Sequence, residues 1–298
     1  MVKKIKFHEV IYSRKQIPCL DSSEPIFIKN QNPNWRELQA YVEIYRKKLY
    51  IEDELTGVLS PKFSIKSKIK VSEFINFIEN SSNADVYFIN PCPQNSLYSL
   101  NSWLHGEALH PGLLKVAKEL LFSIGSKIQI NEKIRQGPDV LCYCNFWAGN
   151  HKFWNEYVGG VLLPIVEFLE KKSDEVVYKK LHAKTLHTEN AVFLPFIVER
   201  LFSTFLQQRA DIVFKPWKHH KNDILNKYCT TEFERIISEA MINFFFNNEP
   251  TSAAVSGQTA NVMELSLKLK VGHDQCSRQI VSHSHSGKKS VTNLISLN

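Results

Sequence analysis

The densest group of residues able to move a proton lies in residues 101–112, the segment NSWLHGEALHPG. His105, Glu107 and His110 can each accept a proton from a hydroxyl nucleophile, and Trp103 offers an aromatic face to a sugar or a base. These side chains could also ligate a divalent metal, although their spacing is not that of a zinc-protease helix. The alternative is a loop whose histidines hydrogen-bond backbone carbonyls. We predict that His105, Glu107 and His110 are catalytic.

An acid and a base that are adjacent in an apolar segment form a second candidate group. Glu199 and Arg200 lie in AVFLPFIVERLFSTFL, which is otherwise mostly apolar. Burying such charges is costly unless they are paired or used in chemistry. Glu199 is therefore either a functional carboxylate or a structural one, paired with a cation such as Lys62 or with Arg200 beside it. We predict that Glu199 and Arg200 form the floor of a ligand cleft.

Polar residues also accompany the ends of the predicted strands. Lys62 lies at the end of LTGVLSPKF, Asn90 ends ADVYFIN, Asn145 lies within CYCNFWAG and His151 follows it. In open α/β sheets, ligands bind beyond the carboxyl ends of the strands, so we expect these four residues around one cleft. Lys62, with Lys66 and Lys68 after it, could meet a diphosphate. Solvated lysines and a turn at Asn90 before Pro91 are the structural alternatives.

The elements that must position these residues alternate along the chain. Strand-like segments alternate with helix-like segments, which favours a mixed, mostly parallel sheet flanked by helices on both faces. The predicted strands are residues 4–12, 55–63, 84–91 and 142–149, and the predicted helices are residues 35–48, 71–80, 151–172, 191–206 and 232–246, with residues 101–125 as a loop feeding another helix. Thr231 and Glu234 fit a capping box for the last of these helices.

The composition changes abruptly near residue 246. All 34 aromatic residues lie at or before Phe246, and the following 52 residues contain none and hold nine serines. A folded α/β domain over residues 1–246 and a mostly disordered tail over residues 247–298 are therefore expected. Within that tail, VMELSLKLKV alternates in polarity and could form one edge strand.

Charge and cysteine content limit the classes of function. The net charge of +7 is scattered rather than gathered into one stripe, which disfavours a nucleic-acid partner and suits a phosphorylated substrate or an anionic membrane surface. Six cysteines without framework spacing are typical of reduced intracellular thiols, and Cys142 and Cys144 are read as small core residues on one strand face. No window reaches the ~20 apolar residues of a membrane span.

Several motifs of well-known enzyme classes are missing from the sequence. It contains no GxxxxGK[ST] loop, no GxGxxG after the first strand, no GxSxG elbow and no kinase signature set. Nucleotide hydrolysis and nicotinamide chemistry are therefore disfavoured.

Over residues 5–215, the order of motifs resembles that of bacterial GT-A-type glycosyltransferases of capsular polysaccharide and lipopolysaccharide biosynthesis. The resemblance lies in order and local pattern, not in close identity. The matching segments are Glu52-Asp53-Glu54, a strand with Gly57 that ends in Lys62-Phe63, the strand 85–91, the His-bearing segment 105–110, Asn145-Phe146 before an aromatic helix with Phe153 and Tyr157, and Glu199-Arg200-Leu201. The basic strand end is Pro-Lys-Phe instead of a tandem Arg motif, and no Asp-x-Asp motif is present.

The resemblance implies transfer of a sugar from a nucleotide-sugar donor to a growing glycan or lipid-linked glycan. It implies a cytoplasmic enzyme, with peripheral contact at the inner membrane surface and no nucleic-acid partner. Lys62, Asn90, Asn145, Glu199 and Arg200 would bind the donor. Mn²⁺ or Mg²⁺ would be the cofactor, but the absence of Asp-x-Asp leaves metal dependence and the metal ligands open. The competing hypothesis is a non-catalytic α/β module that binds glycan or protein within a surface-polysaccharide assembly complex.

Overall fold

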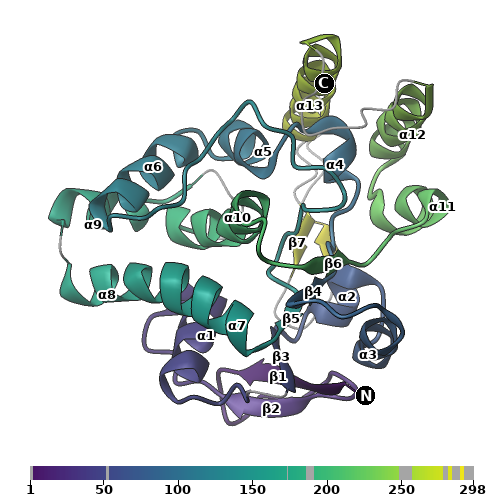
Figure 1. Ribbon diagram of the computed structural model, residues 1–298. Helices are drawn as coiled ribbons and strands as arrows, with labels where there is room; N and C mark the ends of the chain where they lie inside the picture. Colours follow the sequence, from purple (N-terminus) through teal and green to yellow (C-terminus); the bar gives the residue numbers. More distant parts are fainter. Residues whose placement is uncertain are drawn as a thin grey trace.

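The computed structural model describes residues 3–51, 54–172, 174–185, 191–247, 257–277, 281–283 and 289–291. Its centre is a six-stranded sheet with the strand order β2-β1-β3-β5-β4-β6 (Figure 1). The strands are β1 (Lys4–Ile11), β2 (Glu24–Phe27), β3 (Glu54–Leu59), β4 (Val86–Phe88), β5 (Trp147–Gly149) and β6 (Phe214–Pro216). Strand β5 is antiparallel to both of its neighbours, and the other pairings are parallel. The predicted mixed, mostly parallel sheet is confirmed.

The strand predicted at residues 142–149 is correct only at its end. Strand β5 begins at Trp147, and Cys144 and Asn145 have φ angles of 60° and 53°, in the left-handed region. Two such residues in succession turn the chain instead of extending it. Cys142 and Cys144 therefore do not share a strand face, and Asn145 precedes the strand. The edge strands β2 and β6 are additions that the sequence did not predict.

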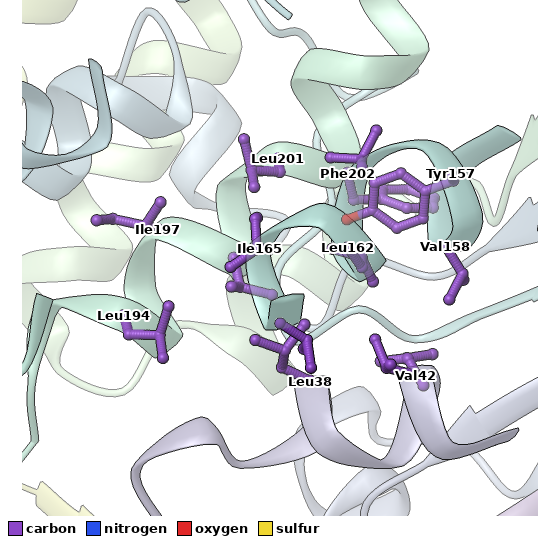
Figure 2. Packing of buried hydrophobic residues seen from close by; sticks show 14 of the residues in the cluster. Leu38, Val42, Tyr157, Val158, Leu162, Ile165, Leu194, Ile197, Leu201 and Phe202 are labelled. Atoms are coloured by element: carbon purple, nitrogen blue, oxygen red, sulfur yellow. The ribbon is translucent and has the colours of Figure 1, made fainter. Parts of the chain in front are cut away.

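One face of the sheet is covered by helices that bury the larger of the two main hydrophobic clusters, in which aliphatic side chains such as Leu162, Ile165 and Leu201 pack with aromatic rings (Figure 2). Trp147 of β5 stacks on Tyr41 with ring centroids 4.9 Å apart, and it meets Trp154 and Phe202. The covering elements are α1 (Glu37–Arg46), α7 (His151–Phe153), the π-helix η2 (Trp154–Leu162), α8 (Leu163–Lys171) and α10 (Phe193–Gln208); the short 3-10 helix η1 (Pro33–Trp35) precedes α1.

The other face of the sheet packs on two shorter helices, α2 (Phe63–Ser67) and α3 (Val71–Asn80). Phe7, Phe63, Phe74 and Phe146 form this second core. Helix α3 spans the residues that the 3.6-residue pattern predicts, and Val71, Phe74 and Ile78 are its buried stripe.

A further helical layer packs on α10 (Figure 1). It consists of α5 (Ser102–Leu109), α6 (Leu113–Ser123) and α9 (Glu175–Leu181), and the short helix α4 (Asn95–Tyr98) precedes it. Residues 101–110, predicted as a loop, are therefore mostly helical. Asn101 begins α5 because its side chain accepts a hydrogen bond from the backbone N–H of Leu104.

After β6 the chain forms α11 (Lys221–Asp223), the π-helix η3 (Ile224–Tyr228), α12 (Glu232–Asn247) and α13 (Gly257–Ser277), and the strands β7 (Val281–His283) and β8 (Lys289–Val291) pair with each other. The prediction of disorder from residue 247 onward is wrong for Gly257–Ser277. The segment VMELSLKLKV is helical, and Met263, Leu267 and Val271 are buried. Buried apolar residues three to four apart outweigh the local alternation that favoured a strand.

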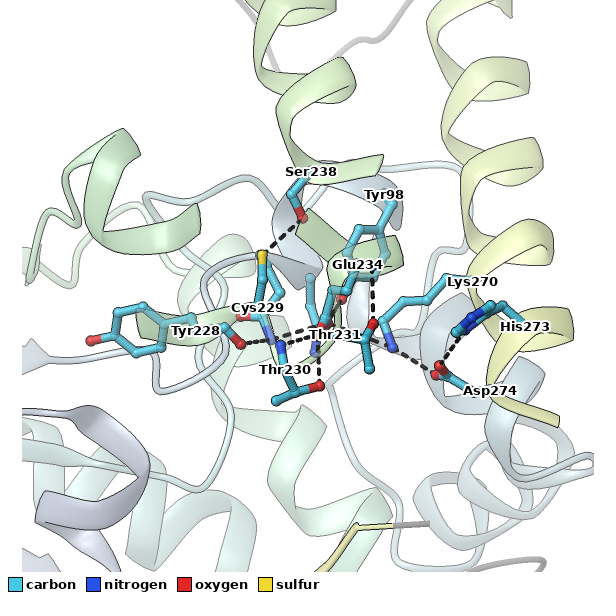
Figure 3. Close-up of polar contacts among 12 residues, drawn as sticks. Tyr98, Tyr228, Cys229, Thr230, Thr231, Glu234, Ser238, Lys270, His273 and Asp274 are labelled. Atoms are coloured by element: carbon cyan, nitrogen blue, oxygen red, sulfur yellow. Dashed lines mark hydrogen bonds and ion pairs between the residues drawn. The ribbon is translucent and has the colours of Figure 1, made fainter. Parts of the chain in front are cut away.

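A buried carboxylate fastens α12 and α13 to α4 (Figure 3). Glu234 is 4% exposed and accepts hydrogen bonds from the Tyr98 hydroxyl (3.0 Å) and the Thr230 backbone N–H (2.7 Å). Lys270 of α13 lies 3.6 Å from the same carboxylate. One half of the predicted capping box is confirmed, because the Thr231 hydroxyl accepts from the Glu234 N–H at 3.1 Å; the Glu234 carboxylate accepts from the backbone N–H of Thr230 instead of Thr231. No helix built from the described residues is both long enough and apolar enough to cross a bilayer.

Candidate functional site

Charged side chains gather in a small pocket at the carboxyl ends of the parallel strands. This charged pocket holds about 60 Å³, which is the room of roughly two water molecules. Its polar lining comes from the residue before α1 and the first residue of α1, from the residue after β3, from α2, from the turn before β5 and from α10. These residues are Arg36, Glu37, Ser60, Lys66, Cys144, Asn145 and Glu199.

The antiparallel direction of β5 explains why the turn before it reaches this pocket. The start of an antiparallel strand lies at the same sheet edge as the ends of its two neighbours, β3 and β4. The Tyr41 hydroxyl fixes the turn, because it lies 2.6 Å from the Asn145 carbonyl oxygen and 3.2 Å from that of Val58. Ser60 and Asn145 therefore come together from segments that are far apart in the sequence.

The pocket concentrates unusual backbone conformations. Seven non-glycine residues of the described chain have positive φ, and three of them line the pocket: Arg36 (49°), Cys144 (60°) and Asn145 (53°). Such conformations cost about 1–3 kcal/mol each and collect at functional sites, where the surrounding structure holds them. Within the described residues, the buried Oδ1 atom of Asn145 has no hydrogen-bond partner. The backbone thus holds an amide oxygen that a ligand can use.

Lys66 is one of the two cations that line the pocket. Its Nζ lies 3.2 Å from the Cys144 Sγ. The Cys144 sulfur, and then the Glu199 and Glu37 carboxylates, raise the pKa of Lys66, so its ammonium is charged at neutral pH. Burial raises the pKa of Cys144 to about 11 against the opposing pull of Lys66. Because the sulfur is then a neutral thiol near pH 7, the lasting attraction for the ammonium comes from the two carboxylates.

Of the predicted donor-binding residues, Asn145 and Glu199 line the charged pocket together. Lys62 lies one turn before Lys66, at the N-cap of α2. Arg200 points elsewhere: it is 3% exposed, and its guanidinium donates to the carbonyl oxygens of Ser102 (2.8 Å) and Phe196 (2.6 Å). Arg200 therefore joins α10 to α5. Its guanidinium donates to these carbonyl oxygens and not to the Glu199 carboxylate, so it is not the predicted partner of Glu199.

Asn90 and His151 do not share the pocket with Asn145. Asn90 is buried, and its Oδ1 accepts from the Cys92 backbone N–H (3.0 Å), so it holds a turn as in the structural alternative. His151 follows β5 and therefore lies at the opposite end of the sheet, where its ring stacks on Tyr50 at 5.2 Å. The expectation of one cleft around all four strand-end residues is therefore wrong: of the four, the charged pocket is lined by Asn145. His151 lies farthest from it because β5 runs opposite to its neighbours.

The predicted catalytic residues and Arg200 form what we call the histidine cluster: His105, Glu107, His110 and Arg200. His105 Nδ1 lies 2.9 Å from the Tyr143 hydroxyl, and burial, followed by the nearby Arg200 charge, holds the pKa of His105 well below its usual value. Glu107 accepts from the backbone N–H groups of Gly112 (2.7 Å) and Leu114 (2.8 Å) at the start of α6. The His110 ring stacks on Phe196 with centroids 4.0 Å apart.

The sequence interpretation left Arg36, Glu37 and Ser60 out of the site and treated Cys144 as core. Lys66 was among the lysines that the sequence proposed for a diphosphate, and it lies one helical turn after Lys62, the N-cap of α2. Glu52 and Asp53, part of the acidic stretch noted in the sequence, lie outside the described residues.

The donor set of the pocket does not match a resident metal site. Across the described part of the chain, no group of three or more His, Cys, Asp or Glu residues is arranged to hold a metal ion. Glu37 and Glu199 share their pocket with the cationic Arg36 and Lys66. Positive side chains at these positions compete with a cation for the two carboxylates.

Comparison with known proteins gave one structural match. No protein-family model matches the chain, and no curated protein matches it. Among solved structures, the chain is similar to the apo structure of the bifunctional glycosyltransferase WbbM, with a TM-score of 0.44 and 14% sequence identity. The match covers 72% of this chain and 44% of that one, so the chain spans less than half the length of WbbM.

Proposed function

We propose that the charged pocket binds the diphosphate of a nucleotide-sugar donor and that the protein is a glycosyltransferase of GT-A type. The observation that carries this proposal is the meeting of Lys66, Glu199 and Asn145 at the sheet edge where α/β proteins bind ligands. A departing diphosphate needs positive charge, which Lys66 and Arg36 can supply. The volume of about 60 Å³ suits a phosphate group, with the rest of the donor lying across the mouth.

Glu199 is the preferred general base of the proposed reaction. It is partly exposed in the pocket, and its carboxylate forms no hydrogen bond or ion pair with the described residues. It does attract the Lys66 ammonium over a longer distance. Its carboxylate would take the proton of the acceptor hydroxyl as that oxygen attacks the anomeric carbon and the bond to the diphosphate breaks. Glu107 is less suited, because both of its oxygens accept backbone hydrogen bonds.

The sequence resemblance supports the finer parts of the proposal. The acceptor would be a glycan or lipid-linked glycan of a bacterial surface polysaccharide or lipopolysaccharide, reached at the cytoplasmic face of the inner membrane. Mn²⁺ or Mg²⁺ would enter with the donor, bound to its phosphates, since the described residues form no metal site of their own. The charge of +7 suits both an anionic donor and an anionic membrane surface.

The test is the thermal stability of the full chain with UDP, GDP and CMP, each with and without Mn²⁺ or Mg²⁺. One of the nucleotides should raise the melting temperature by several degrees, since ligand at about 100 times its Kd stabilises by roughly 2.7 kcal/mol. Lys66→Met should abolish the shift, while Lys115→Met, a change in a lysine of α6 outside the pocket, should keep it. No shift with any nucleotide would overturn the proposal and favour a non-catalytic module.

A further inference from the structure

A second concave surface lies along the open edge of the sheet, away from the charged pocket. It crosses β6 and the side of α3 and holds about 730 Å³, within the usual range for ligand sites of roughly 300–1,000 Å³. None of its lining residues belongs to the charged pocket. We call this surface the edge groove and propose that it binds an oligosaccharide chain.

Aromatic rings give the edge groove a surface for sugar rings. Phe77 of α3 and Trp217 after β6 are both half-buried, with ring centroids 5.3 Å apart and planes tilted by 59°. Phe77 is supported from behind by Phe74, and a hydrogen bond of 2.7 Å from the Trp217 N–H to the Phe88 carbonyl anchors the backbone at Trp217. Rings held this way present fixed apolar faces, on which the C–H faces of sugars pack at little entropic cost.

The polar lining of the edge groove suits hydroxyl groups. Amide and hydroxyl side chains at Asn76, Asn80 and Ser82 can each both donate and accept hydrogen bonds. The charged lining consists of two acids, Glu73 and Asp139, and two bases, Lys215 and Lys218, so its formal charge sums to zero. A neutral chain of many hydroxyls matches this set, whereas a nucleic acid would require a basic surface.

An extended peptide fits the edge groove less well. Strand β6 has three residues. The Val213 carbonyl and the Trp217 N–H form backbone hydrogen bonds toward β4, so the backbone groups of Phe214 and Pro216 point to the outer side of the strand. Pro216 has no N–H to donate. The outward edge of β6 therefore offers one N–H, too few for a peptide to extend the sheet.

The edge groove would hold the growing glycan while its end reacts elsewhere. That role rests on the proposed sugar transfer, but the binding itself does not. Trp217 allows a selective readout, because the other four tryptophans, at positions 35, 103, 147 and 154, are all buried. Contact with a sugar ring should therefore change the intrinsic fluorescence through Trp217.

The experiment titrates the full chain with maltohexaose, cellohexaose and β-1,4-galactohexaose, measured by fluorescence and by calorimetry. At least one hexasaccharide should bind saturably, and Trp217→Ala should weaken its binding about tenfold, as expected for loss of one stacking contact of roughly 1.4 kcal/mol. The matched control is Phe122→Ala, which removes a ring that is 89% exposed on α6 and should leave binding unchanged.

Asn76→Ala, at an exposed position of α3, provides a second test that leaves both rings in place and should weaken binding severalfold. No binding of any of the three hexasaccharides at millimolar concentration would overturn the inference. So would equal binding by wild type and Trp217→Ala, or competition for the groove by an uncharged extended hexapeptide. Lys66→Met separates the two proposals, because it should lose the nucleotide response and keep oligosaccharide binding.

Discussion

The charged pocket and the histidine cluster contain similar residue types but use them differently. In the histidine cluster, Arg200 and Glu107 bond to backbone groups at helix ends, and His105 meets a buried tyrosine. In the charged pocket, Glu199 and Asn145 keep oxygens that no hydrogen bond within the described residues satisfies. Acids and bases already satisfied inside the protein stabilise the fold, whereas those left available at a pocket can serve a ligand.

The largest effect that separates the two regions should come from Glu199→Gln. Removing a general base typically costs 10²–10⁴-fold in rate, so we expect a fall of about that size in sugar transfer with an unchanged melting temperature. Initial rates with the donor selected by the nucleotide screen measure it. Full activity of Glu199→Gln together with loss in His105→Gln or Glu107→Gln would return the base to the histidine cluster.

Arg200→Met should produce the next largest effect, on stability. It removes two charge-assisted hydrogen bonds, to the Ser102 and Phe196 carbonyl oxygens, which then keep only their helical backbone donors, so the free energy of unfolding should fall by about 3 kcal/mol. Urea unfolding followed by circular dichroism measures this. Lys66→Met, its counterpart in the charged pocket, should change the unfolding midpoint far less. Equal losses for both variants would contradict the comparison.

The acid dependence of stability should depend on His105. Its pKa is lowered in the folded protein, so below the ordinary histidine pKa of about 6.5 the unfolded chain binds the extra proton. Stability should therefore fall as pH drops below about 6.5, with up to ~1.4 kcal/mol per pH unit from this residue. His8 and His219 contribute with the same sign. His105→Gln should flatten the slope measured by urea unfolding from pH 7 to 5, and an unchanged slope would refute this assignment.

Glu107→Ala should have the smallest effect. The carboxylate caps the start of α6, and losing such a cap costs about 1 kcal/mol of stability. Transfer activity measured at 25 °C should stay at the wild-type level. A fall in kcat beyond about tenfold, at a temperature where the variant is fully folded, would show that Glu107 acts in the chemistry.

Periodic segments made much of the fold predictable. Helix α3 and strands β1, β3 and β4 were predicted from the spacing of apolar residues within each segment, without knowledge of what packs against it. Helix α13 does not, because its burial depends on contacts with α4, α5 and α12 that no local pattern reveals. Strands β2 and β6 are short edge strands with little apolar content facing the core.

The candidate site was predicted only in part, for a related reason. Asn145 was chosen for its place in the predicted strand 142–149 and Glu199 for its place in an apolar helix, and both line the charged pocket. Arg36 was not predicted, because its part in the pocket depends on a left-handed backbone before α1. The hydrogen bonds of Glu107 were not predicted, because its partners are backbone N–H groups, which residue types do not reveal.

The reversed direction of β5 also determines which changes in chain length the site can tolerate. Residues just before Trp147 belong to the charged pocket, while residues just after Gly149 lie a full strand length away, at the other end of the sheet. One added residue before β5 would displace the Asn145 oxygen from the charged pocket. The same addition after Gly149 would fall beside Asp85 and Tyr50 and leave the pocket geometry intact. Among natural variants of this chain, differences in length should therefore accumulate after β5 and be rare before it.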